Sequence, residues 1–191
     1  MANVNRPMGL VPIAAGAGEI RTRKYYVAAG ASQKIRIGDP VTISGSSDAR
    51  GCPSVVRSTV GSGYRITGAV TGVAPVDPLI TTAPDLNSTA LAASTAGYVW
   101  VADDPFQYFM IQDDGTGYVL SAGDVGRNTN LVSTVSGGLE MDATPLSTTT
   151  SYQLNIKRLI DSPDNAFGSY ANWAVTINTH TSLPDGGITG T

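Results

Sequence analysis

The chain has 191 residues, of which 14% are charged and 41% are hydrophobic, and its formal net charge is −3. This length suits one domain, or one domain with a small lobe, and the negative balance argues against binding nucleic acid through overall positive charge. A single cysteine excludes an intramolecular disulfide, and the sequence lacks an apolar run of about 18 residues that could span a membrane. The start also lacks the pattern of a signal peptide, so we expect synthesis in a cytoplasm.

Charge is divided unevenly along the chain. Residues 1–65 hold nine of the twelve Lys and Arg and three acidic residues, a balance of +6. Residues 66–191 hold three basic and twelve acidic residues, a balance of −9. Such asymmetry could orient copies of the chain when they dock on each other or on a shared lattice. The alternative is that the charges are scattered by chance over a folded surface.

In the first half of the chain, Gly and Pro separate short runs rich in Val, Ile, Thr and Tyr, a pattern typical of strands and turns. Residues 1–18 are predicted to form an extended arm, because Pro7 and Pro12 disfavour helix. The best helical candidate is 83–96, which is weakened by Pro84 and by many Ser and Thr. The strands predicted here are 20–27, two short strands within 35–43, and 64–74, with 44–63 as a loop.

In the second half, 98–102 and 106–112 flank Asp103-Asp104-Pro105 and are predicted to form a hairpin with an acidic turn. The run 152–160 alternates well, and 173–180 is the last strand, followed by a flexible Gly-rich tail at 181–191. Together these segments predict an all-β fold, an antiparallel β-sandwich or barrel over 19–180 with an extended N-terminal arm. Shorter strands are predicted at 118–120, 129–132 and 138–141.

Residues that carry out chemistry are scarce. His180 is either a general base or a partly buried side chain bonded to backbone or to another subunit, and Cys52 reads as an inert thiol. One His and one Cys cannot build a zinc site within one chain. The candidates for a hard cation are Asp103-Asp104 and Asp113-Asp114-Gly115, although turn geometry alone explains Asp at such positions. No carboxylate pair stands out for glycosidase chemistry, so we expect no enzyme activity, no metal and no cofactor.

Several segments follow one another in an order that can be compared with a known family. They are 6–12, 23–27, 37–41, 68–73, 98–105, and 162–165 followed by 175–180. In this order the chain resembles the capsid cement (head decoration) proteins of tailed bacteriophages, most clearly at its two ends and at the Ala-Asp-Asp-Pro turn of 102–105. The loop 44–63 and the segment 83–96 match nothing in that pattern.

The resemblance implies a virion protein on the outer surface of an icosahedral head, commonly a homotrimer. Such a protein bridges adjacent major capsid subunits and resists the pressure of packed DNA. The resemblance implies no catalytic residue. The expected partners are the major capsid protein and further copies of this chain, with no direct contact to nucleic acid or membrane.

Two groups of residues are expected to contact the capsid or a sister subunit. One lies in the arm, where 2–12 could cross a neighbour and pair with a sheet edge. The other is a set of basic residues that could face an acidic surface of the capsid or of a sister subunit. The alternatives left open are a tail-associated or receptor- or glycan-binding β-module, and an enzyme such as a glycan hydrolase. The predicted contact residues are Asn5, Arg6, Pro7, Met8, Arg21, Arg23, Lys24 and Arg36.

Overall fold

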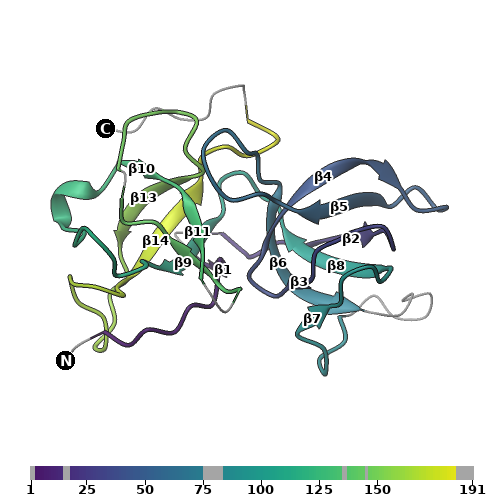
Figure 1. Cartoon of the computed structure of the whole chain (residues 1–191), viewed down its shortest axis with the longest axis horizontal. Helices are drawn as coiled ribbons and strands as arrows, with labels where there is room; N and C mark the ends of the chain where they lie inside the picture. Colours follow the sequence, from purple (N-terminus) through teal and green to yellow (C-terminus); the bar gives the residue numbers. More distant parts are fainter. Residues whose placement is uncertain (1–2, 15–17, 75–83, 135–136, 145, 184–191) are drawn as a thin grey trace.

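The computed structural model describes residues 3–14, 18–74, 84–134, 137–144 and 146–183. Strands and turns form two lobes that lie side by side, here called the barrel lobe and the sheet lobe (Figure 1). A single 3-10 turn, Ala122–Asp124, interrupts the strands, and the described ranges contain no α-helix. The all-β fold predicted from the sequence is therefore confirmed.

The barrel lobe is a closed barrel with the strand order β2-β5-β4-β6-β8. Its pairs are antiparallel except for β2 against β5, which run parallel and are joined at Tyr26 and Ser54. Alternate residues fill the interior, as in Val99 and Val101 of β8. The strands are β2 (Arg23–Val27), β4 (Pro40–Ser47), β5 (Pro53–Arg57), β6 (Gly68–Ala74) and β8 (Gly97–Ala102), with a small sheet of β3 (Ile35–Arg36) and β7 (Ala90–Leu91).

The sheet lobe is a five-stranded antiparallel sheet with the order β1-β9-β14-β13-β10, together with a β11–β12 ribbon. Trp173, Phe109 and Met141 are among the fully buried side chains of its core. That core also includes Ile66 and Ala102 from the barrel side, so apolar packing continues from one lobe into the other. The strands are β1 (Val11–Ile13), β9 (Tyr108–Gln112), β10 (Asn128–Thr129), β11 (Leu131–Ser133), β12 (Leu139–Met141), β13 (Leu154–Leu159) and β14 (Asn172–Ile177).

The predicted hairpin over 98–112 is wrong, although both of its strands exist. Strand β8 belongs to the barrel and β9 belongs to the five-stranded sheet. The turn at Asp103-Asp104-Pro105 therefore carries the chain from one lobe to the other instead of reversing it within a sheet. An acidic turn between two strands indicates a change of direction, but it does not indicate which neighbour the second strand will pair with.

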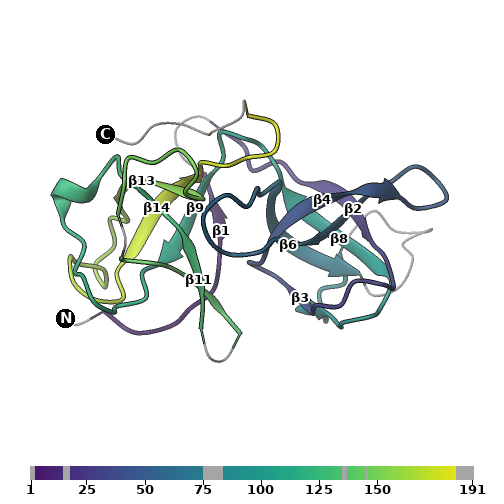
Figure 2. The same cartoon turned by 45° about the horizontal axis from the view of Figure 1, so that its top comes forward.

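Three further sequence predictions are corrected. The predicted loop 44–63 contains the end of β4, a turn and the whole of β5, and the β4–β5 hairpin projects from the barrel (Figure 2). The helical candidate 83–96 forms turns and strand β7 over its described part, 84–96. Residues 118–120 form no strand. Of the predicted tail, 184–191 lies outside the described residues.

Candidate interaction surfaces

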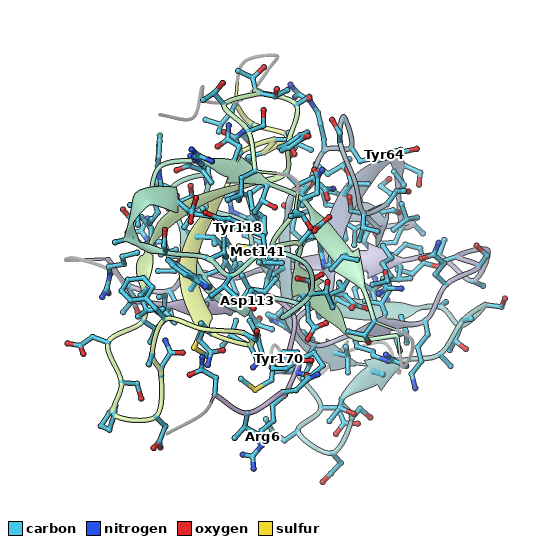
Figure 3. The ribbon with its side chains drawn as sticks, turned by 60° about the vertical axis from the view of Figure 1, so that its left-hand side comes forward. Arg6, Tyr64, Asp113, Tyr118, Met141 and Tyr170 are labelled. Carbon is cyan, nitrogen blue, oxygen red and sulfur yellow. The ribbon has the colours of Figure 1, made fainter. Side chains whose placement is uncertain are left out.

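The N-terminal segment lies along its own sheet lobe. The backbone N–H of Arg6 donates to Oε1 of Gln112 (2.8 Å), and Nε2 of Gln112 donates to the carbonyl oxygen of Val4 (2.7 Å). Farther along, β1 forms the edge strand beside β9. Figure 3 shows Arg6 pointing away from the lobe. Contact of this segment with a neighbouring subunit stays a prediction; among its predicted contact residues, Asn5, Arg6 and Met8 are exposed and Pro7 is half-buried.

The same segment then crosses between the lobes. The N–H of Gly9 donates to the carbonyl oxygen of Leu139 in the sheet lobe (3.2 Å), and the N–H of Leu10 donates to that of Gly38 in the barrel lobe (2.9 Å). Gly38 has a φ of +89°, and a Cβ there would lie 2.1 Å from the carbonyl oxygen of Met8. Glycine is therefore required where the two segments cross.

A second crossing follows the end of β14. The N–H of Ile66 donates to the carbonyl oxygen of Thr179 (3.1 Å), and the N–H of Thr181 donates to that of Ile66 (3.0 Å). The hydroxyl of Thr181 also bonds to that of Thr67 (3.2 Å). Segments near both ends of the chain thus join the lobes by backbone hydrogen bonds, and the shared apolar core adds to them, so the two lobes form one connected body.

Three of the predicted contact residues, Arg21, Arg23 and Lys24, gather at the start of β2 and are exposed. Nη1 of Arg23 lies 3.5 Å from Oδ2 of Asp103, while the Arg23 side chain remains 77% exposed. The hydroxyl of Tyr25 donates to the same carboxylate oxygen (2.7 Å). Burial and this hydrogen bond raise the pKa of Tyr25 well above its ordinary value, so the phenol stays a neutral donor.

Arg36, the fourth predicted basic contact, lies apart from that group. Its Nη1 donates to the carbonyl oxygen of Gly137 in the turn between β11 and β12 (2.6 Å), which adds a further bond between the lobes. Its backbone N–H donates to Oδ2 of Asp39 (2.9 Å), and the same oxygen lies 3.2 Å from Nε of Arg57. Burial raises the pKa of Asp39, against the opposing effect of these partners. The half-buried Arg36 therefore supports the lobe junction.

The uneven distribution of charge along the sequence corresponds to a difference in net charge between the two lobes. The described residues of the barrel lobe, 18–74 and 84–102, carry eight Lys and Arg against four Asp and Glu, a balance of +4. The described residues 3–14 and 103–183, which form the sheet lobe, carry four basic and nine acidic residues, a balance of −5. The two lobes, which lie side by side in Figure 1, thus carry opposite net charges.

The acidic turn at Asp113 is saturated by donors from the chain itself. Oδ1 of Asp113 accepts from the N–H groups of Gly115 (3.0 Å) and Tyr170 (2.8 Å). Its Oδ2 accepts from the N–H of Ala171 (3.0 Å) and from Nε1 of Trp173 (3.1 Å). Asp113 therefore ties the end of β9 to the start of β14, inside the sheet lobe (Figure 3). Among the described residues, no group of three or more His, Cys, Asp and Glu is arranged to hold a metal ion.

The side chains of His180 and Cys52 pack against other parts of the chain. Nδ1 of the buried His180 accepts from the N–H of Ser182 (3.0 Å), and burial lowers the pKa of the imidazole, which is therefore neutral at pH 7. The thiol of Cys52 lies 3.5 Å from the carbonyl oxygen of Lys24, and burial together with the charge of Asp48 raises its pKa. A thiol that stays protonated is a poor nucleophile. His180 is only 1% exposed, which keeps its ring from a substrate, so neither group supports the catalytic alternative.

An open hollow of about 460 Å³ occupies the end of the barrel lobe, and no sequence pattern predicted it. One wall is a pair of tyrosines, Tyr26 and Tyr98, with ring centroids 5.5 Å apart. The Tyr98 hydroxyl donates to Oδ2 of Asp48 (2.7 Å), and Nζ of Lys24 lies 5.0 Å from the Tyr98 ring centroid. We call this feature the barrel-end hollow; it is lined by Tyr26, Ser47, Asp48, Ala49, Arg50, Ala96, Gly97 and Tyr98.

Sequence reasoning also missed two groups in the sheet lobe. Phe167 is 53% exposed in the loop before β14, and loops lack the periodicity from which exposure can be read. Glu140 is buried in β12 and its Oε1 has no hydrogen-bond partner. Burial, with the charges of Asp114 and Asp113, raises the pKa of Glu140. Leu139 and Met141 on either side face the core, so the alternation placed Glu140 on the opposite face without indicating that this face is covered too.

The described part of the chain contains no helix that is both long and apolar enough to cross a membrane. Comparison of the chain with protein-family models, with curated proteins and with solved structures finds no match.

Proposed function

We propose that this chain is a structural, non-enzymatic virion protein of a tailed phage that binds the outer surface of an icosahedral head, as a trimer, and bridges adjacent major capsid subunits. The observation that carries the proposal is the connected two-lobed body with oppositely charged lobes. A bridging protein needs two contact regions held at a fixed separation. The order of segments along the chain, which resembles that of capsid cement proteins, supports the same function.

The lobe junction provides that fixed separation. Backbone bonds of Leu10 with Gly38 and of Ile66 with Thr179 and Thr181 connect the lobes, and the Arg36 bond to Gly137 adds a further connection. Force applied to one lobe by a capsid subunit is therefore transmitted to the other through several parallel connections. A body joined by one flexible linker could bind two subunits but could not hold them together against outward pressure.

Many copies on one head multiply a modest contact. A surface ion pair contributes only about 0–1 kcal/mol, so the exposed Arg21, Arg23 and Lys24 can provide orientation more than affinity. A copy that contacts two capsid subunits gains from the high effective concentration of its second contact once the first has formed. The stability of the shell then rises with the number of bridges.

Copy number per virion tests this function. We expect quantitative mass spectrometry of purified particles to find the chain in a fixed ratio to the major capsid protein, at hundreds of copies per head. A few copies per particle, located at the tail, would contradict the proposal and favour a tail-associated or receptor-binding module. Recovery of the chain in empty heads as well as in full ones would support an outer location independent of DNA.

A further inference from the structure

The loop 161–170, here called the acidic-aromatic loop, projects from the sheet lobe in a fixed conformation. Nδ2 of Asn165 donates to the carbonyl oxygens of Ile160 (2.8 Å) and Asn172 (2.9 Å), and its Oδ1 accepts from the N–H of Asn172 (2.8 Å). From the other side, Asn3 donates to the carbonyl oxygen of Ala166 (2.8 Å) and accepts from its N–H (3.0 Å). The loop is therefore shaped before it meets a partner, which lowers the entropy lost on binding.

The base of this loop is strained and firmly supported. Tyr170 has a φ of +63°, a conformation that residues other than glycine rarely adopt, and Asp113 accepts from its N–H. Phe167 rests on the buried Trp173 with ring centroids 5.8 Å apart, yet remains 53% exposed. Backbone strain of this kind is retained where the surrounding structure enforces it, often at functional sites. Here the strained residue closes the loop that carries the exposed ring of Phe167.

Two carboxylates lie in the same loop, six and three residues before Phe167. Asp161 and Asp164 are exposed in the same loop, as is Pro163. The loop therefore combines an exposed aromatic side chain with two negative charges. A surface that fits it needs an apolar, aromatic recess bordered by positive charge.

The barrel-end hollow has these properties. Tyr26 and Tyr98 form its aromatic wall, Ala49 and Ala96 add apolar surface, and Arg50 is an exposed cation within its lining. Lys24, also exposed, adds a second positive charge above the Tyr98 ring. The carboxylate of Asp48 also lines the hollow, where it accepts from the Tyr98 hydroxyl and from the backbone N–H of Arg50, so the three charged groups sum to +1. Aromatic rings in offset or tilted contact attract one another beyond the effect of area burial, and complementary charge gives specificity.

The loop and the hollow lie at opposite ends of the molecule. The chain between β13 and β14, which forms the loop, is drawn at the left of Figures 1 and 2. The β4–β5 hairpin, whose turn lines the hollow, is at the right. One copy therefore cannot fill its own hollow. Two such complementary patches on different faces produce a head-to-tail contact between copies.

We propose that the acidic-aromatic loop of one copy docks in the barrel-end hollow of the next copy. Phe167 enters against Tyr26 and Tyr98, and Asp164 faces the positive charge of Arg50 and Lys24. A head-to-tail contact of this kind closes into a ring when the rotation between copies allows it, which gives a three-fold assembly a defined interface. The inference deepens the proposed function, on which it rests, by assigning the surfaces through which copies associate.

Sedimentation velocity of the purified full chain over a range of concentrations tests the contact. We expect the unmodified chain to self-associate, and Phe167→Ala to weaken association about tenfold or more, as for a central aromatic residue of an interface. Because Phe167 also covers Trp173, Asp164→Lys provides a second loop variant that leaves this packing intact. Arg50→Glu with Lys24→Glu should weaken association from the side of the hollow.

Matched controls and a mixing experiment make the test specific. Phe106→Ala removes an aromatic ring that is 73% exposed in a different loop, and Lys34→Glu reverses an exposed charge of the barrel lobe outside the hollow; both should leave association unchanged. A loop variant mixed with a hollow variant retains one intact loop and one intact hollow. We expect this mixture to form one-to-one pairs although neither variant associates alone.

Three results would overturn the inference. They are an unmodified chain that stays monomeric at every concentration, a mixture that forms no pairs, and hollow variants that lose binding to a glycan or a capsid protein while self-association is unchanged. A monomeric chain that still binds phage heads and bridges their subunits would overturn this inference and the trimer, and would leave the bridging function standing. A chain that associates through these surfaces but does not bind heads would do the reverse.

Discussion

Replacing Asp113 with Asn tests whether this carboxylate holds the sheet lobe together. Asp113→Asn keeps the shape of the side chain but replaces one acceptor oxygen with an NH₂ group. Each carboxylate oxygen accepts two N–H donors, at 2.8–3.1 Å, so two donors lose their acceptor whichever way the amide is turned. They are either the half-buried N–H groups of Gly115 and Tyr170 or the buried N–H groups of Ala171 and Trp173. A buried donor left without a partner costs about 1–3 kcal/mol and a half-buried donor costs less, which gives a loss of about 1–6 kcal/mol in the free energy of unfolding.

Thermal and urea unfolding of the purified variant measure this loss. For a chain of this size each kcal/mol lowers Tm by about 2–4 °C, so we expect a decrease of roughly 2–24 °C. Asp161→Asn, an exposed carboxyl in the neighbouring loop, is the matched control and should change stability by less than about 0.5 kcal/mol. If Asp113→Asn is as stable as this control, the four hydrogen bonds do not hold the turn and the account of the sheet lobe is wrong.

Three further predictions concern buried charge, the N-terminal segment and the basic strand. Burial raises the pKa of Glu140 above its unfolded value of 4.5, so the folded state favours the protonated form and stability is lost as pH rises through the folded pKa. Glu140→Gln should therefore be more stable than the unmodified chain at pH 7–8, and this gain should vanish near pH 4. Urea unfolding at several pH values measures the gain, and an equal gain at all pH values would refute the prediction. Leu10→Ala should cost about 2–5 kcal/mol of unfolding free energy, because Leu10 is fully buried, whereas Met8→Ala should cost less than about 0.5 kcal/mol; equal losses would show that the segment is not anchored at Leu10. Binding to phage heads should weaken as ionic strength rises toward about 0.5 M, and Arg21→Gln with Arg23→Gln should reduce that salt dependence; binding that is insensitive to salt would indicate apolar packing instead.

Local patterns predicted most strands but not their partners. The alternation over 152–160 places Leu154 and Ile156 on the core face, and the structure confirms both, with a bulge between Ile156 and Arg158 that shifts the remainder. The dipeptide Asp103-Asp104 indicated a turn correctly. Whether the next strand returns to the same sheet depends on contacts distant in sequence, such as β8 with β2, and no local signal carries that information.

For the candidate surfaces too, contacts between residues close in sequence could be predicted, whereas contacts between distant residues could not. Arg21, Arg23 and Lys24 could be placed together from one strand, because neighbours in sequence remain neighbours in space. Arg36 could not be separated from them, because its bond to Gly137 joins residues that are 101 positions apart. The barrel-end hollow combines three segments, around 26, 47–50 and 96–98, and so it becomes visible only when the barrel closes.

Reconstitution on undecorated heads tests the central claim most directly. Phage heads prepared without this chain are mixed with the purified protein, and bound copies are measured together with the temperature at which packed DNA is released. The proposed bridging function predicts saturable binding at many sites on each head and a higher release temperature that rises with occupancy. Heads that bind no protein, or that bind it and release DNA at the same temperature as before, would contradict the claim that this protein holds the shell together.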